Sequence, residues 1–195
     1  ESETDKGELD KIDRYLNLGG RMLVLLNNQA RTGLEAYLGK WGAEVGNNLL
    51  RDEDNSNNGL LVATNFSGHP ITKPLIRSRL VSGLPRTVEK QAAAKQDADA
   101  PQVEALALTG PKGRVITDLR PDGAFTTPRD RQGEVAFVVA IEKGTLKGMS
   151  AERGATRMVV AGDGMILSNQ LLDNFQGNQQ FANLAINWLL DRSLL

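Results

Sequence analysis

Three uninterrupted apolar runs most constrain how this chain can fold. They cover residues 22–26, 135–141 and 158–161, and glycine or polar residues bound them. Successive side chains of a strand point to opposite faces of a sheet, so a strand that is apolar at every position needs a covering layer on both faces. The runs therefore predict strands buried within a layered fold.

Helical patterns alternate with these strands. Apolar residues recur at helical spacing over about residues 5–18, about 32–40 and again near the end, where Asn178 is the expected N-cap of a helix that contains Phe181 and Trp188. Further strands are expected at 60–64 and near 79–81. Strands that alternate with helices indicate an α/β layer fold with a mostly parallel sheet.

The length of 195 residues favours a single α/β domain spanning residues 1–195. The stretch of about 85–133 differs in character. Residues 91–100 predict an exposed loop, and short strands near 103–108 and 115–116 flank a turn, so we expect an irregular, β-rich insertion there. The chain opens on a helix, whereas such units usually begin with a strand, and we therefore expect the first strand of the domain to be missing from this sequence.

The composition removes several classes of function. Lys and Arg total 23 against 24 Asp and Glu, without a block of like charges, which argues against a nucleic-acid surface and a polybasic membrane patch. The chain has no cysteine and one histidine, which excludes thiol nucleophiles, zinc sites built on Cys/His clusters and triads that need a second histidine. Carboxylate chemistry, backbone-based binding and protein contact remain.

The most suggestive polar segment follows the apolar run 158–161. In parallel α/β sheets ligands bind beyond the carboxyl ends of the strands, where Asp163, Ser168 and Asn169 would stand. The alternative is that residues 162–164 form a turn whose carboxylate accepts hydrogen bonds from nearby backbone N–H groups. A similar Gly-Asp start occurs in serine esterases, but Gly164 stands here in place of their serine.

His69 is the second candidate, in a loop before Pro70. A lone histidine could titrate near neutral pH or orient a ligand, or it could bond backbone atoms and fix the turn. The acidic residues Asp52, Glu53 and Asp54 could suggest a hard-metal site, but their spacing matches no calcium loop. We expect a solvated loop there, no bound metal and no cofactor.

Three groups of segments, in chain order, carry a family resemblance. They are residues 15–26 with 38–42; residues 65–72, which include His69-Pro70-Ile71-Thr72, with 133–142; and residues 159–169 continuing through Gly177-Asn178 to 187–190. Together they span nearly the whole chain. The sequence resembles the soluble domain of the gliding-motility-type auxiliary component of uncharacterised ABC transport systems, which is related to a domain of an intraflagellar transport subunit.

This resemblance implies a three-layer fold of the flavodoxin-like or class I glutamine amidotransferase-like group. It also implies a domain on the extracytoplasmic, periplasmic side of a bacterial inner membrane, anchored by segments outside this sequence. Its implied partners are the membrane and ATPase subunits of an ABC transporter. The amidotransferase relatives use a cysteine nucleophile, so their activity does not carry over to a chain without cysteine.

We therefore expect a noncatalytic domain that binds a protein or a glycan-like ligand, and no nucleic acid. The ligand-binding candidates are Asp163, Ser168, Asn169 and His69. The alternative is a hydrolase that acts on a carbohydrate or an ester through Asp163, with His69 as a second participant. A third hypothesis, a purely structural assembly domain, predicts a broad exposed apolar patch without a pocket.

Overall fold

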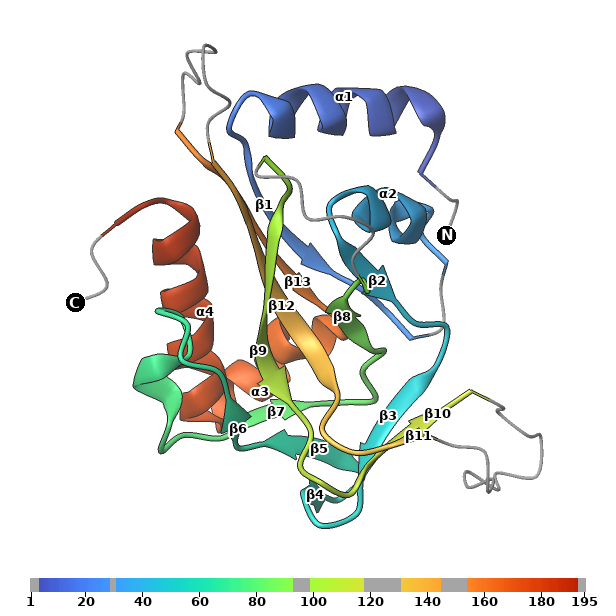
Figure 1. The fold of residues 1–195 in the computed structure, drawn as a ribbon. Coiled ribbons are helices and arrows are strands. Elements are labelled where there is room, and N and C mark those ends of the chain that lie inside the picture. Colours follow the sequence, from blue (N-terminus) through green and yellow to red (C-terminus); the bar gives the residue numbers. More distant parts are fainter. Residues whose placement is uncertain (1–3, 29–30, 93–98, 118–130, 145–153, 193–195) are drawn as a thin grey trace.

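The computed structural model describes residues 4–28, 31–92, 99–117, 131–144 and 154–192. Its centre is a five-stranded sheet with the strand order β1-β13-β12-β9-β6 (Figure 1). In that order the strands span Arg21–Leu25, Thr156–Ala161, Ala136–Lys143, Gln102–Leu108 and Asn65–Phe66. The three apolar runs form β1, β12 and β13, as predicted.

The central sheet is mixed, so the prediction of a mostly parallel sheet is wrong. β1 pairs with β13 in parallel, whereas the β13–β12, β12–β9 and β9–β6 pairs are antiparallel. No α-helix lies between β9, β12 and β13 in the described part of the chain, and such a helix is the usual crossover between parallel neighbours. The apolar runs predicted burial on both faces, which does not depend on the direction of the neighbouring strand.

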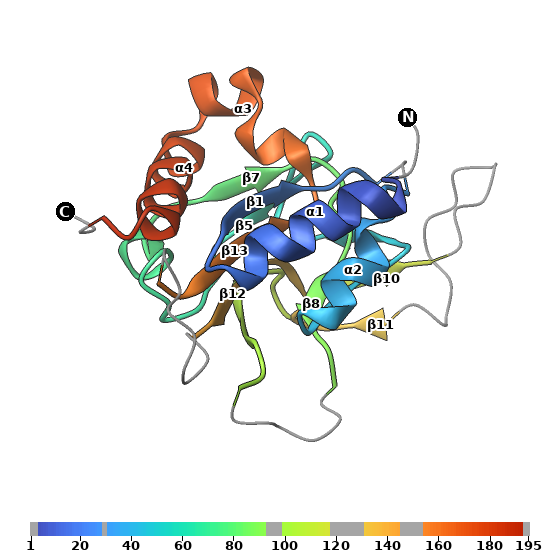
Figure 2. The same ribbon diagram turned by 90° about the horizontal axis from the view of Figure 1, so that it is seen from above.

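Helices cover both faces of this sheet. On one face, α1 (Lys6–Asn17) and α2 (Leu34–Lys40) pack on a cluster that includes Val160, and on the other α4 (Gln176–Leu189) packs on a cluster that includes Val159 (Figure 2). Adjacent residues of β13 thus belong to different layers, as the pleat requires. None of the helices in the described ranges is both long enough and apolar enough to cross a membrane.

Three smaller sheets and short helices surround this core. The sheets pair β3 (Leu49–Asp52) with β10 (Gly113–Ile116) and β11 (Arg131–Gln132), β2 (Ala43–Val45) with β8 (Val88–Lys90), and β5 (Leu60–Ala63) with β4 (Ser56–Asn57) and β7 (Leu80–Ser82). The short helices are η1 (Lys73–Leu75), η2 (Gly164–Leu167) and α3 (Asn169–Asn174). The region expected as an insertion contributes β9 to the central sheet; its residues 93–98 and 118–130 lie outside the described ranges.

Local sequence signals predicted the start of α1 correctly but not the start of α4. Asp5 and Glu8 form a capping box at the start of α1, so the helix expected over 5–18 is confirmed. Asn178, in contrast, is not an N-cap: α4 begins two residues earlier, after Phe175. Asn178 is fully buried, and its amide pairs with the backbone N–H and C=O of Val81 at 3.0 and 2.7 Å, as a neighbouring strand would.

Backbone packs directly on backbone where residues 79–86 cross the ends of β13 and α4, a contact that we name the β7 seam. A Cβ atom on Gly162 would lie 2.1 Å from the carbonyl oxygen of Arg86, and one on Gly177 would lie 2.0 Å from that of Arg79. Real Cβ atoms essentially never approach so closely. Only glycine fits at these two positions.

The first prediction concerns this seam. Gly162→Ala should lower the free energy of unfolding by about 3 kcal/mol, because the added methyl group must push the Arg86 backbone away. Gly39→Ala is the matched control. Gly39 lies inside α2 with open space around it, and alanine there should raise the free energy of unfolding by about 0.5–1 kcal/mol. Urea denaturation of the two variants measures both free energies of unfolding. Equal changes in the two variants would contradict the direct backbone contact at Gly162.

A buried ion pair ties α2 to Arg86, the last residue of the β7 seam. The Arg86 guanidinium donates to Glu35 Oε1 and to the backbone oxygen of Gly46, both at 2.7 Å, and Arg86 is buried. Burial raises the pKa of Glu35, but the hydrogen bond from Arg86, backbone hydrogen bonds and the positive charge of Arg86 together lower it below its usual value. The folded state therefore favours the ionised carboxylate.

The second prediction follows from this lowered pKa. The carboxylate contributes stability above its unfolded pKa of about 4.3, and that contribution is lost as the pH falls through the lower folded value. Glu35→Gln should therefore cost about 1–3 kcal/mol of unfolding free energy at neutral pH, and less in acid, where the wild-type carboxyl is also neutral. Denaturation from pH 7 to about pH 3 tests this, and a constant difference would contradict it.

Candidate functional site

A cleft of about 670 Å³ opens at the carboxyl ends of β1 and β13, the parallel pair; we refer to it as the β1–β13 cleft. The start of η2, part of the β7 seam and the turn between β4 and β5 form the remaining walls. The lining residues are Leu25, Leu26, Asn27, Asn28, Asn58, Gly59, Leu60, Gly83, Leu84, Asp163, Gly164 and Met165. Ligands of α/β sheets bind at this position, beyond the carboxyl ends of parallel strands.

The walls of the cleft combine apolar side chains with amides and are largely uncharged. Leu25 and Met165 are 41% and 39% exposed, so both present apolar surface to a ligand. Asn27 and Asn58 add exposed amides, and of the described residues that line the cleft only Asp163 carries a charge. Phosphate recognition usually relies on Arg or Lys, so these walls suit a neutral ligand with an apolar part.

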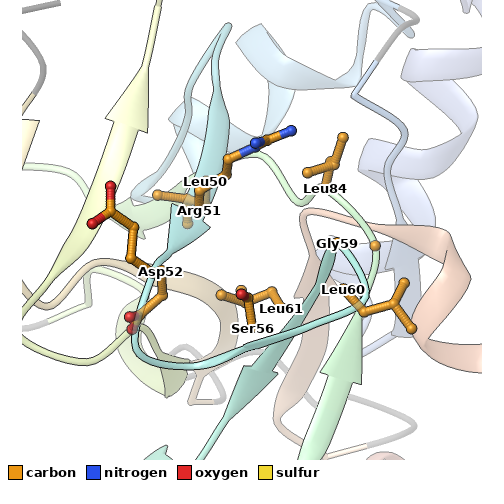
Figure 3. A pocket seen from close by; sticks show the side chains of 10 residues that line it. Leu50, Arg51, Asp52, Ser56, Gly59, Leu60, Leu61 and Leu84 are labelled. Carbon is orange, nitrogen blue, oxygen red and sulfur yellow. The ribbon is translucent and has the colours of Figure 1, made fainter. Parts of the chain in front are cut away.

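A smaller hollow of about 110 Å³ adjoins the cleft and shares Gly59, Leu60, Gly83 and Leu84 with it. Figure 3 shows Arg51, from β3, extending toward Leu84 across this hollow. The volume has room for several water molecules but not for a sugar.

Asp52, at the rim of that hollow, has a structural role. Its Oδ1 accepts hydrogen bonds from the backbone N–H groups of Asp54 and Asn55, and its Oδ2 accepts one from that of Gly110 at 2.6 Å. The expectation of an open solvated loop therefore fails at Asp52, which is buried, although Glu53 and Asp54 are exposed. Within the described ranges no three acidic or histidine side chains gather as metal ligands would.

Asp163 lies at the base of the cleft, where three donors occupy its carboxylate. Oδ2 accepts from the Ser82 hydroxyl at 2.7 Å and from the Gly83 N–H at 2.6 Å, and Oδ1 accepts from the Met165 N–H at 3.0 Å. The carboxylate thereby caps η2 and holds the end of β7. This is the arrangement that the turn interpretation of residues 162–164 predicts, extended by contacts to a distant strand.

The structure does not bring the other candidates to the cleft. Ser168 caps α3, accepting a hydrogen bond from the Leu171 N–H at 3.4 Å, and Asn169 is the exposed first residue of that helix. Neither lines the cleft, although both lie in the segment that follows Asp163. The rule that placed Asp163 at the ends of the parallel strands does not extend to them.

His69 is buried in the loop after β6. Its Nδ1 accepts a hydrogen bond from the Ile71 N–H at 3.1 Å, and its ring meets Trp188 of α4 edge to face at a centroid distance of 5.0 Å. Burial, with a contribution from the charge of Arg157, lowers the pKa of His69, although Glu104 and Glu142 act in the opposite direction. The side chain fixes its own turn and packs on α4.

His69 and Asp163 lie toward opposite ends of β13. Arg157, near the start of β13, stacks its guanidinium 5.0 Å from the ring of Trp188, against which His69 also packs. Asp163 follows the other end of this strand, six residues further along, which corresponds to about 20 Å. Asp163 lines the β1–β13 cleft and His69 does not, so the cleft does not bring the two side chains to one substrate.

Sequence reasoning missed most of the cleft. Asn27 and Asn28 follow β1 as Asp163 follows β13, so the rule that singled out Asp163 could have found them too. The turn at Asn58-Gly59 also carried a signal, because both residues have positive φ and Asn-Gly is the commonest pair in two-residue hairpin turns. No local pattern indicated Leu84, whose place depends on the β7 seam.

The third prediction tests the role of Asp163. Asp163→Asn presents an NH₂ group to donors and leaves at least one of them unsatisfied, so it should cost about 1–3 kcal/mol of unfolding free energy. Asp173→Asn, at an exposed carboxylate on α3, is the control and should be nearly neutral. An equally small effect at both positions, measured by chemical denaturation, would contradict the structural role.

The sequence matches no family model and no curated protein. Among solved structures, the fold resembles that described as "mmIFT52 N-terminal domain", with a TM-score of 0.65 and 15% identity over 99% of this chain and 75% of that one. A putative ThuA-like protein from Bacteroides uniformis ATCC 8492 matches more weakly, with a TM-score of 0.49 and 17% identity over 96% and 65% of the two chains. The first likeness confirms a mixed α/β fold related to the intraflagellar-transport domain, and it concerns the fold alone.

Proposed function

We propose that this chain is a noncatalytic binding domain of an ABC-transporter-associated auxiliary membrane protein. In this proposal it stands on the extracytoplasmic side of a bacterial inner membrane and binds a protein or a glycan-like ligand in the β1–β13 cleft. Its assembly partners are the membrane and ATPase subunits of the transporter.

One observation carries the binding role: the cleft offers apolar walls and amides, while its carboxylate is committed to holding the fold. A general base or nucleophile needs a free lone pair directed at the substrate. Hydrogen bonds from Ser82, Gly83 and Met165 occupy three of the roughly four lone-pair sites of the Asp163 carboxylate and hold it against the protein backbone. The cleft is therefore better suited to holding a ligand than to changing one.

The hydrolase alternative has less support. It requires Asp163 and His69 to converge on a substrate, whereas Asp163 lines the β1–β13 cleft and His69 does not. His69 also uses Nδ1 to accept the Ile71 N–H, and burial disfavours its protonated form. The structural-assembly alternative predicts a face without a pocket, whereas the described surface contains the β1–β13 cleft.

The transport assignment rests on the sequence resemblance described above. We also assign the fold to the flavodoxin-like or class I glutamine amidotransferase-like group. Its support is the position of the cleft at the carboxyl ends of a parallel pair, β1 and β13, between helical layers.

Affinity capture of the full-length protein from its native membrane tests the transporter assignment. ABC membrane and ATPase subunits should co-purify in stoichiometric amounts. Their absence from a capture that retains the intact, membrane-bound protein would refute the transporter assignment. The binding role would then depend on variants of the residues that line the β1–β13 cleft.

The fourth prediction concerns those variants. Met165→Lys places a charge beside the apolar side chains of the cleft and should weaken binding of the protein that co-purifies with the full-length chain about tenfold or more. Leu18→Lys is the matched control, since Leu18 is also an exposed apolar residue, 46% accessible, but lies outside the cleft. Calorimetric titration compares the two, and equal affinities for both variants would place the ligand elsewhere.

A further inference from the structure

The chain from the loop after β6 to β7 lies along α4 and is held to it at both ends. Near the start of α4, the Asn178 amide pairs with the backbone of Val81. Near the end of α4, the ring of Trp188 meets the His69 ring edge to face. The contact at Val81 contains no titratable group, whereas the contact at Trp188 depends on a histidine.

His69 is bonded in a way that only its neutral ring allows. Nδ1 accepts the Ile71 N–H at 3.1 Å, so the proton of the neutral ring must be on Nε2. In the imidazolium ion both ring nitrogens carry a proton and neither can accept. Protonation therefore leaves the buried Ile71 N–H without its acceptor, whichever way the ring turns.

The surroundings of the ring oppose a positive charge. Burial is the largest cause that lowers the pKa of His69, and the charge of Arg157 on β13 acts in the same direction. Glu104 on β9 and Glu142 on β12 raise this pKa, but not enough to restore its ordinary value. The neighbouring helix α4 carries no charged side chain, and Lys73 of the loop itself is exposed. The closed loop thus favours neutral His69.

We propose that His69 is a pH-sensitive switch: its protonation breaks the hydrogen bond to Ile71 and releases residues 67–75 from the end of α4, while the pairing of Val81 with Asn178 holds. The inference concerns the response of the fold to acid and does not depend on the proposed binding role. Histidine is the side chain whose ordinary pKa lies closest to neutral pH, so this release needs only mild acid.

The direction of the effect follows from the lowered pKa. Above about pH 6.5 His69 is neutral in both the closed and the open loop, and its contacts contribute their full stability. Below that value the open loop takes up a proton before the closed one does. The ratio of open to closed loop therefore rises about tenfold for each pH unit, until the pH falls to the pKa of the closed form.

The test is hydrogen exchange of the full chain, prepared without a histidine tag and followed by NMR from about pH 7.5 to about pH 5. The protection factor of the Ile71 amide, which is corrected for the pH dependence of exchange itself, should fall about tenfold or more. That of the Val81 amide should change by less than about threefold. Because the sequence has one histidine, its ring resonances report the Nε2 proton and the titration of His69 without ambiguity.

Two variants separate the bond from the ring. In His69→Asn the side-chain oxygen accepts the N–H two residues further along and does not titrate, so protection at Ile71 should stay constant within about threefold. His69→Phe keeps an aromatic ring beside Trp188 but has no acceptor, and its Ile71 amide should be weakly protected at every pH.

Three results would overturn the inference. The first is a wild-type Ile71 amide whose protection does not change with pH, and the second is an equal loss of protection in His69→Asn. The third is an equal loss at Ile71 and Val81, because acid would then unfold the domain as a whole instead of releasing one end of the segment. If His69→Asn does not fold, the ring resonances and the two wild-type amides decide the question by themselves.

Discussion

The β7 seam determines how the layers of this molecule meet. There, buried polar groups and two glycines hold residues 79–86 against the ends of β13 and α4. A buried hydrogen bond stabilises the fold, and a buried polar group that loses its partner destabilises it. These hydrogen bonds therefore favour a single arrangement of residues 79–86 against β13 and α4. Gly83 and Leu84 belong to the β7 seam and also line the β1–β13 cleft. The position of this wall of the cleft therefore depends on long-range contacts that no local sequence pattern indicates.

Much of the fold could be predicted because its signals are local. Apolar runs predicted β1, β12 and β13, and helical spacing with Asp5 and Glu8 predicted α1. Strand direction could not be predicted in this way, since a run buried on both faces looks the same beside a parallel or an antiparallel neighbour. The prediction that Asn178 is an N-cap was wrong for a related reason. Its side chain suits an N-cap, but in the fold it bonds to the backbone of Val81, almost a hundred positions away.

The candidate site was likewise predictable only in part. The rule on carboxyl ends of parallel strands led to Asp163, which lines the β1–β13 cleft, because β1 and β13 are the parallel pair even in a mixed sheet. It could not show that Ser82 and Gly83 would occupy the carboxylate. A residue type that suits catalysis also suits the bonding of backbone N–H groups, and only the tertiary partners distinguish the two uses.

The parallel pairing of β1 with β13 also bears on how the chain assembles. The register joins Arg21 to Arg157, so this part of the sheet closes a loop of 136 residues. Contacts of such long range form slowly, and a chain made from its N-terminus exposes the apolar β1 long before β13 exists. The apolar β1 is therefore a segment in need of protection during synthesis, and a chaperone would meet it long before β13 can cover it.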